Sequence, residues 1–242
     1  DKDGVLIDLD IDVSVSGVVY GVNLRPLGTP EGFQFTIRDN TGGLQVFSPS
    51  GNFGYTVKEG DSISVKGVVG QFAGLAQLTF VEEITLHSSN AVLKTPTVVQ
   101  QLSESVESDL IMFENVILVD ESEWPIAPLA TNQFADVRVK NQMGTFVLRI
   151  DSDIDIDGTL PPVGYFDLIG LGGQHDFAKT YDSAYYIFPR YKGDIIKKTQ
   201  KVLTMEGDSI RVFERYTDST DAITVRISNI TQPTLIEVGI KS

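Results

Sequence analysis

One stretch decides the fold of this chain, Gly60-Asp-Ser-Ile-Ser-Val-Lys-Gly-Val-Val-Gly-Gln-Phe72. It has a second copy, Gly164-Tyr-Phe-Asp-Leu-Ile-Gly-Leu-Gly-Gly-Gln-His175. At a constant offset, the first copy's Gly67, Gly70 and Gln71 fall on Gly170, Gly173 and Gln174. Each copy alternates apolar and polar residues and ends in a glycine-rich bend, which predicts a β-strand followed by a turn. Two copies in register indicate a duplicated β-domain.

Composition sets the outer bounds. The chain has 242 residues, of which 41% are hydrophobic, and this length suits two compact domains of about 100 residues each. Cysteine is absent, which excludes disulfides and thiolate metal sites. No apolar run reaches the roughly 18 residues of a membrane-spanning helix. We therefore predict two domains and no membrane span.

The charge balance is strongly acidic. The 19 Lys and Arg residues face 33 Asp and Glu residues, for a net charge of -14. Nucleic-acid binders depend on basic surfaces, because phosphate contacts and counterion release supply most of their affinity. The acidity counts against nucleic-acid binding and favours a soluble monomer or one part of a larger multidomain chain.

Local patterns divide the chain into five segments. Short alternating stretches predict two sets of five strands, and each set has the rhythm of a small closed barrel. Residues 97–102 are expected to form one short helix, and three further strands are expected near the C-terminal end. The predicted segments are an acidic lead-in at 1–11, a first barrel at 12–87, a linker at 88–109, a second barrel at 110–198, and at 199–242 the start of a β-sandwich domain or strands docked on the second barrel.

Three stretches of the sequence resemble the OB-fold: Gly17-Val-Val-Tyr20, Phe35-Thr-Ile-Arg-Asp-Asn-Thr-Gly-Gly-Leu-Gln-Val-Phe47 and the strand that begins at Gly60. More narrowly, they resemble OB-like modules of secreted and cell-surface bacterial proteins of the Bacteroidetes type, which occur beside extracellular nuclease and adhesive domains. The resemblance implies an all-β chain of two tandem OB-like five-stranded barrels followed by a partial immunoglobulin-like β segment. It also implies an extracellular or cell-surface location.

Candidate ligand-binding residues follow from the OB-fold. Such barrels bind ligands across their second and third strands and the adjoining loops, through aromatic stacking and basic side chains. The alternative for any single candidate is packing in a barrel wall, and alternation places most of Phe33, Phe35, Phe47, Phe80 and Phe188 in the cores. The candidates are Tyr20, Arg25, Gln34, Arg38 and Phe72 in the first unit, and Trp124, Arg138, His175, Tyr181, Tyr185 and Arg190 in the second.

Two further motifs have a structural and a functional interpretation. The paired Gln71 and Gln174 could contact a ligand, but we expect them to tie the glycine bend to neighbouring backbone. The segment Asp153-x-Asp155-x-Asp157-Gly158 matches the first half of a calcium loop. The twelfth loop position is Gly164, where a bidentate Glu is required, so an acidic surface loop is the favoured interpretation and calcium the alternative.

Catalytic motifs are missing from the sequence. Its two histidines, His87 and His175, have no metal-binding spacing, and there is no nucleophile elbow or phosphate-binding loop. We therefore predict no enzyme and no cofactor other than the calcium alternative. The predicted function is a non-catalytic binding or spacer module. The alternatives are a nucleic-acid-binding accessory region of an extracellular nuclease, which would hold single strands, a module that binds extracellular polysaccharide, and a hydrolase with an unfamiliar carboxylate site.

Overall fold

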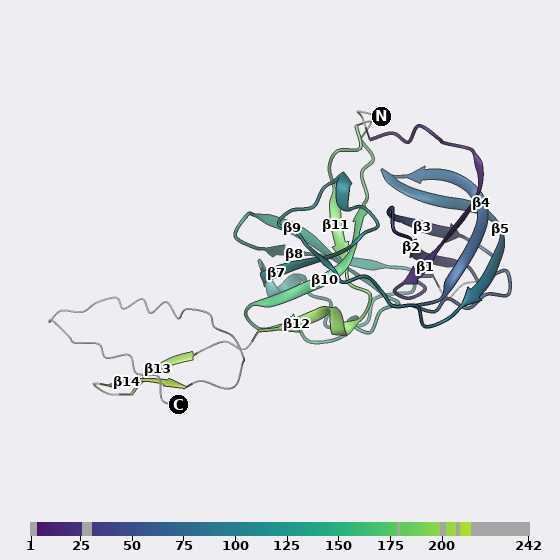
Figure 1. Cartoon of the computed structure of the whole chain (residues 1–242). Coiled ribbons are helices and arrows are strands. Elements are labelled where there is room, and N and C mark those ends of the chain that lie inside the picture. Colours follow the sequence, from purple (N-terminus) through teal and green to yellow (C-terminus); the bar gives the residue numbers. More distant parts are fainter. Residues whose placement is uncertain (1–3, 26–30, 179, 199–201, 207–208, 214–242) are drawn as a thin grey trace. The chain divides into compact units, whose positions relative to one another are not determined.

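The computed structural model describes residues 4–25, 31–178, 180–198, 202–206 and 209–213, the last two ranges by their backbone only. The structure is nearly all β, with two barrels inside a compact unit at residues 1–200 (Figure 1). No helix in these described ranges is long and apolar enough to cross a membrane.

The first barrel is closed, and its strand order is β1-β2-β3-β5-β4. Its third and fifth strands pair in parallel, with Val46 opposite Leu78, and the other pairs are antiparallel. This is the strand order of an OB-fold, a partly open Greek-key barrel of five strands. The strands are β1 (Asp12–Tyr20), β2 (Phe33–Arg38), β3 (Gly43–Ser48), β4 (Ser62–Phe72) and β5 (Leu75–Ser88).

The second barrel repeats this order as β7-β8-β9-β11-β10, closed by the pairing of β10 with β7. Its third and fifth strands are again parallel, with Leu148 opposite Ile187. The all-β prediction of two OB-like barrels is confirmed. The strands are β7 (Leu110–Leu118), β8 (Phe134–Lys140), β9 (Thr145–Asp151), β10 (Phe166–Gln174) and β11 (Tyr185–Phe188), with β12 (Ile195–Lys197) at the edge of β10 and short 3-10 helices η2 (Glu121–Glu123) and η3 (Lys192–Asp194).

The predicted linker helix is wrong. Residues 97–98 form the short strand β6 (Thr97–Val98), which pairs in parallel with β7, and a 3-10 turn η1 (Glu104–Val106) follows. Parallel pairing with the first half of β7, which the register of β8 does not reach, replaces the helix here. In the C-terminal unit, β13 (Val202–Glu206) and β14 (Ser209–Phe213) form an antiparallel pair. The other strands predicted there, at 222–228 and 235–240, lie outside the described residues.

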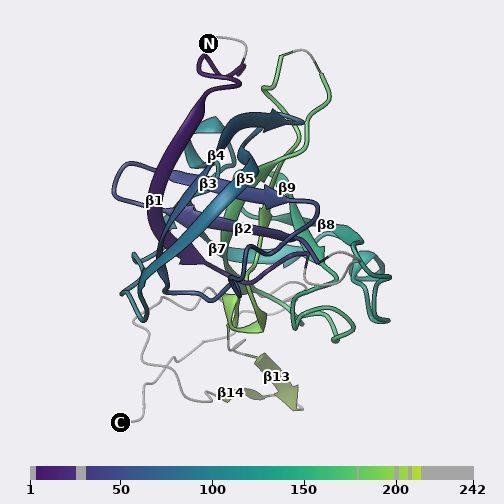
Figure 2. The same ribbon diagram turned by 90° about the vertical axis from the view of Figure 1, so that its right-hand side faces the viewer.

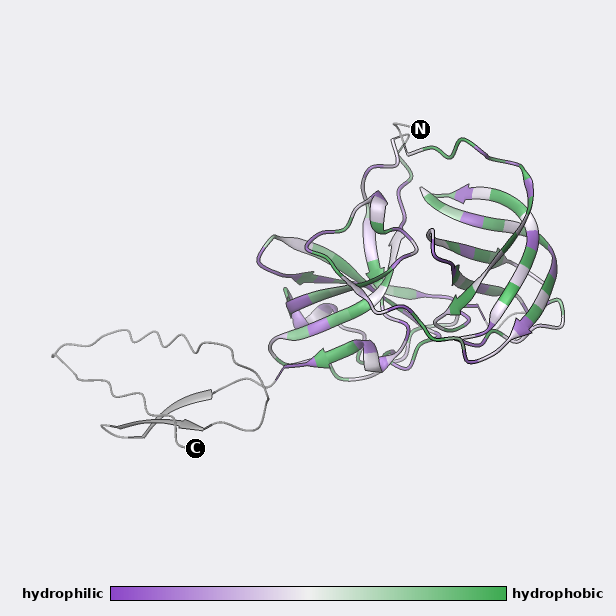
Figure 3. Ribbon diagram, viewed as in Figure 1, coloured by the Kyte–Doolittle hydropathy of each residue, from purple (hydrophilic) through white to green (hydrophobic). Residues whose placement is uncertain are grey.

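Each barrel has its own apolar core. Inward residues such as Phe33, Phe35 and Val46 fill the first barrel, while Phe113, Leu148 and Phe166 fill the second. Apolar and polar residues alternate along the strands, as the hydropathy colouring shows (Figure 3), because successive side chains of a strand point to opposite faces.

The repeated glycines allow close cross-strand approach. A Cβ on Gly67 would lie 2.6 Å from the Thr79 carbonyl oxygen, and one on Gly173 would lie 2.5 Å from the ring of Tyr186, its cross-strand partner. Glycine is thus required where backbone or a ring lies against the strand. The prediction for Gln71 is confirmed, since its amide donates to the carbonyl oxygens of Gly74 at 2.6 Å and Gly4 at 2.7 Å.

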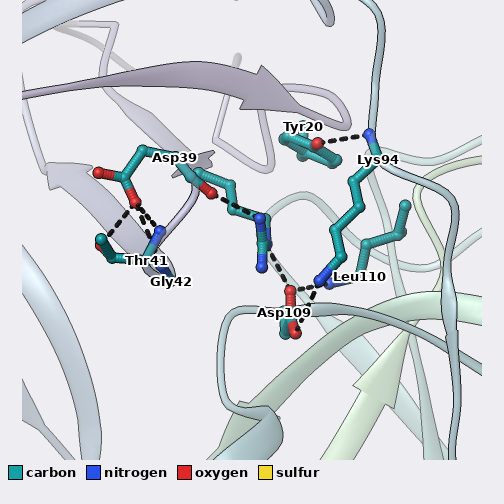
Figure 4. Close-up of polar contacts among 8 residues, drawn as sticks. Tyr20, Asp39, Thr41, Gly42, Lys94, Asp109 and Leu110 are labelled. Atoms are coloured by element: carbon teal, nitrogen blue, oxygen red, sulfur yellow. Dashed lines mark hydrogen bonds and ion pairs between the residues drawn. The ribbon is translucent and has the colours of Figure 1, made fainter.

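A buried arginine of the first barrel binds the linker. Arg38, at the end of β2, donates to the Asp109 carboxylate and is only 8% exposed. Lys94 reaches the same carboxylate at 3.9 Å, and its backbone N–H donates to the Tyr20 hydroxyl at 2.9 Å (Figure 4). The charge of Asp109 thereby holds the start of the second barrel against the end of β2.

A second buried arginine joins the barrels directly. Arg190, which follows β11, makes ion pairs at 2.8 Å with Asp194 in its own barrel and with Glu59 in the first. The Glu59 carboxylate also accepts the Gly21 N–H at 2.8 Å. An apolar cluster completes the contact between the barrels; it comprises Tyr20, Leu110, Leu171, Tyr186 and Phe188. Figure 2 shows the two sets of strands from a second direction.

A glycine pair in the β2–β3 turn tests the fit of the linker against the first barrel. A Cβ on Gly43 would lie 1.9 Å from the Ser108 carbonyl oxygen, whereas one on Gly42 meets nothing within 4 Å. We expect Gly43→Ala to lower the free energy of unfolding by about 1–3 kcal/mol through overpacking, and Gly42→Ala to leave it nearly unchanged. Chemical denaturation measures both. Equal stability of the two variants would contradict the close linker contact.

Candidate binding cleft between the barrels

A cavity of about 660 Å³ lies between the two barrels. Both barrels contribute to its walls, and the contributing faces are those that OB-folds use for ligands. In the first barrel these are β2, β3, the loop after β1 and the β4–β5 hairpin. In the second they are β8, β9, β10 and β11. The polar and aromatic side chains that line the cavity include Arg25, Gln34, Gln45, Phe47, Phe72, Gln77, Phe80, Phe134, Arg149, Asp151, Gln174, His175 and Tyr186.

The wall from the first barrel carries glutamines and aromatic rings. Gln45 and Gln77 are paired residues of the parallel strands β3 and β5, and the Gln77 amide nitrogen donates to the Gln45 amide oxygen. Phe47 lies two residues further along β3, and the Arg25 guanidinium lies over its ring at 5.6 Å. This wall therefore combines uncharged hydrogen-bonding groups with an aromatic face.

The wall from the second barrel is built around Arg149. Its guanidinium lies 3.8 Å from the centre of the Phe134 ring and 4.0 Å from that of Tyr186. Two of its nitrogens donate to Asp136, at 2.7 and 2.8 Å. The bidentate pair and the two stacked rings fix this arginine and offset its charge.

His175 belongs to an aromatic group at the cleft. Its ring centre lies 4.9 Å from that of Phe177, 6.0 Å from Phe134 and 6.1 Å from Phe72. Burial and the nearby charge of Arg149 lower the pKa of His175 below its ordinary value of 6.5. The imidazole is therefore neutral at pH 7, and the group presents an uncharged surface that spans both barrels.

Phe80 has an unusual backbone and a highly exposed ring. Its φ is 45°, in the left-handed region, and its side chain is 80% exposed while lining the cleft. It lies in a β-bulge, where Gly67 alone stands opposite residues 80–82. The bulge shifts the inward position from Phe80 to Val81, which is buried. Phe80 is therefore an exception among the five phenylalanines of which most were expected in the cores, because a bulge re-aims the side chains that follow it.

The structure brings four of the eleven candidate residues to the cleft, namely Arg25, Gln34, Phe72 and His175. The others make contacts elsewhere. Arg38 and Arg190 are held in the ion pairs between the barrels and the linker. Tyr20 is buried in the apolar cluster between the barrels, where its hydroxyl accepts the Lys94 N–H.

The remaining four candidates lie in the second barrel, away from the cavity. Trp124 is buried in its core, and the indole N–H donates to the Thr159 carbonyl oxygen at 2.9 Å. The Tyr185 hydroxyl donates to Glu104 at 3.2 Å and to the carbonyl oxygen of Tyr181 at 3.4 Å. Arg138 makes an exposed ion pair with Glu123.

Sequence patterns did not single out Phe47, Phe80, Phe134, Arg149 or Tyr186 as site residues. Strand alternation marks which residues leave a barrel core, but the outward face of one barrel is here covered by the other. The signal that was available is the glycine at 173, which leaves room for the ring of its cross-strand partner Tyr186.

The acidic loop binds backbone amides. Asp157 accepts the Leu129 N–H at 2.9 Å, Asp155 accepts the Lys192 N–H at 2.5 Å, and the Asp153 N–H donates to Asp151 at 3.0 Å. Among the residues that the structure describes, no three His, Asp or Glu side chains group closely enough to hold a metal ion.

Comparisons with known proteins name no family for this chain. No family model matches it, and no curated protein matches it either. Among solved structures, one match is a murine DNA-binding protein bound with double-stranded DNA. That match is 9% identical, covers 77% of this chain and 100% of that chain, and has a TM-score of 0.37. A likeness this distant carries no argument about function.

The half-buried carboxyl of Asp151 predicts a pH dependence of stability. Burial raises its pKa from 3.8 to about 7, against a smaller opposing effect of the Asp153 N–H bond. Because the folded-state pKa exceeds the unfolded one, the folded state binds the extra proton, and stability falls as pH rises from about 4 to 7. We expect Asp151→Asn, which keeps the oxygen acceptor, to flatten this decline in thermal unfolding profiles.

A second carboxyl supplies the control for this profile. The hydroxyl and N–H of Ser122 hold the pKa of Asp120 below its ordinary value. Its contribution to stability is therefore constant above the unfolded pKa and lost as pH falls. Asp120→Asn should lower stability by the same amount across pH 4–7 and change the slope of the profile only below about pH 4. Parallel wild-type and Asp151→Asn profiles across pH 4–7 would contradict the raised pKa of Asp151.

The backbone of Phe80 predicts a gain in stability when the side chain is removed. We expect Phe80→Gly to raise the free energy of unfolding by up to about 1 kcal/mol, because the left-handed conformation costs a non-glycine residue more than glycine loses in chain entropy. Thr85→Gly in the same strand is the control, and it should destabilise by about 0.5–1 kcal/mol. Urea unfolding distinguishes them, and equal losses in both variants would argue against strain at Phe80.

Proposed function

We propose that this chain is a non-catalytic binding module that takes its ligand in the cleft between the two barrels. The observation that supports this most directly is the cavity of about 660 Å³ lined by aromatic rings and glutamine amides. Cavities of this size with a few polar groups among apolar walls are typical of ligand sites. Both contributing faces are the ones that OB-folds present to ligands.

The chemistry of the lining supports a binding role over catalysis. Among the described residues around the cavity there is no Ser, Cys or Lys, and the hydroxyl of Thr79 donates to the Val68 carbonyl oxygen at 3.3 Å. The His175 ring packs against the rings of Phe72, Phe134 and Phe177. Arg149 is committed to Asp136 and two rings. Arg149 and His175 are thus held in place by their neighbours, and a preformed lining of this kind suits ligand binding.

We further propose that the module belongs to an exported or cell-surface protein. The resemblance of its strands to OB-like modules of such proteins supports this location, and a chain without cysteine is compatible with it. In that setting the ligand is an extracellular macromolecule, and polysaccharide and single-stranded nucleic acid are the two classes to compare.

A probe panel tests the binding role. The panel comprises a glycan array and a fluorescein-labelled oligo(dT) strand followed by anisotropy at low salt. We expect saturable binding to one class, weakened at least about tenfold by Phe72→Ala or Arg25→Ala, since truncating a central aromatic or arginine contact typically costs this much or more.

The control variant is Phe53→Ala. Phe53 is a partly exposed phenylalanine with φ 52° that packs on Phe33 away from the cavity, so its removal should leave binding unchanged. An absence of binding to every probe would refute the binding role and leave a spacer function.

A further inference from the structure

The charges around the cleft oppose an anionic ligand. Its basic groups are Arg25 and Arg149, and its acidic groups are Asp10 and Asp151. Arg149 already pairs with Asp136, so the arginine charge that remains for a ligand belongs to Arg25. A polyanion would also meet the repulsion of a chain with net charge -14. Phosphate binding depends on neutralisation by several cations, and this site does not supply them.

The polar groups of the cleft are mainly neutral amides. Gln34, Gln45, Gln77 and Gln174 all line it. The bond between Gln77 and Gln45 uses one amide nitrogen and one amide oxygen, so each side chain keeps its other group for a ligand. An amide both donates and accepts hydrogen bonds without carrying charge. Sugar hydroxyls need that combination, because each hydroxyl also donates and accepts.

One amide oxygen in the cleft wall has no partner. The Gln174 amide nitrogen donates to the Ser183 carbonyl oxygen at 3.1 Å. Its oxygen is buried against Gly74 in the β4–β5 turn, where an added Cβ would lie 1.9 Å from it. It accepts no hydrogen bond within the described part of the chain, and the side chain is only 1% exposed. A buried acceptor without a donor is costly, but this oxygen lies against Gly74 and does not face the ligand space. The amides open to a ligand are therefore those of Gln34, Gln45 and Gln77.

Exposed aromatic rings lie at the cleft beside these amides. Phe80 and Phe72 are 80% and 55% exposed, and Phe80 is held outward by the bulge opposite Gly67. A left-handed φ on a large residue is a strained conformation of the kind that concentrates at functional sites. The negative face of an aromatic ring attracts the weakly positive C–H groups of a flat apolar surface, such as one face of a pyranose ring.

We propose that the cleft binds an uncharged glycan, with a sugar ring packed on Phe80 and hydroxyls bonded to the glutamine amides. This rests on the proposed function and names its ligand class. The amides match neutral hydroxyls, the ring matches a sugar face, and the charge balance excludes the cation-dependent binding of a polyanion. Arg25, which lies over Phe47, adds a donor for a hydroxyl at the rim.

The test compares three probe classes on the whole chain by isothermal titration and affinity electrophoresis. The neutral polysaccharides are laminarin, arabinoxylan and galactomannan, the acidic ones are polygalacturonate and chondroitin sulfate, and the nucleic acid is oligo(dT). We expect binding to at least one neutral polysaccharide. Phe80→Ala should weaken it at least about tenfold, as for loss of a stacking contact, while Phe53→Ala leaves it unchanged and the thermal midpoint of both variants stays near that of the wild type.

Each other result identifies which proposal fails. Binding to only acidic polysaccharide or oligo(dT), weakened by Phe72→Ala, overturns the neutral glycan and leaves the cleft as a binding site. Neutral-glycan binding that neither Phe80→Ala nor Phe72→Ala weakens places the site elsewhere and overturns this inference. Failure of every class to bind overturns the binding role itself.

Discussion

Two buried arginines hold the barrels in one arrangement, and the cleft depends on them. Arg190 of the second barrel pairs with Glu59 of the first, and Arg38 of the first pairs with Asp109 at the start of the second. A buried ion pair adds little net stability, but removing one partner costs about 3–5 kcal/mol because the other charge is left unpaired. The pairs therefore act mainly on orientation. Sliding one barrel over the other would break both pairs, so the pairs favour the arrangement in which the two walls enclose the cleft.

The cleft is a property of the pair of barrels, because each barrel supplies half of the chemistry. The first contributes the amide pair Gln45 and Gln77, and the second contributes the stacked Arg149 and Tyr186. The parallel strand pair of the first barrel places Gln77 opposite Gln45. The equivalent pair of the second barrel places Tyr186 opposite Val147. The same outward positions of two similar folds thus carry different side chains. A single OB-like barrel presents one open face, whereas two facing barrels enclose a volume that can exclude water from a ligand.

Strand positions, turns and barrel topology were predictable from the sequence, because period-two alternation and glycine bends are local signals. The interpretation of Arg38 and Arg190 as ligand-binding residues illustrates what was not predictable. Alternation places both outside a barrel core, and only the packing of one barrel on the other shows that this outside is buried. Phe80 departs from the alternation for a different reason, because the bulge opposite Gly67 changes the phase of alternation within β5. Packing between domains and bulge positions are both tertiary features, and a local pattern carries neither.

The acidity of the chain and the neutrality of its cleft have complementary effects. Surface carboxylates such as Asp39, Asp120 and Glu123 have pKa values below their ordinary range through local hydrogen bonds, so they stay charged and keep the surface hydrated. In the cleft, burial instead raises the pKa of Asp151 to about 7 and lowers that of His175, which reduces charge where a ligand would lie. If the cleft binds a neutral glycan as proposed, the acidic surface would repel polyanions at a distance, and the aromatic and amide contacts would select among neutral ligands. In that case the selectivity would depend on the charge of the protein surface as much as on the side chains that line the cleft.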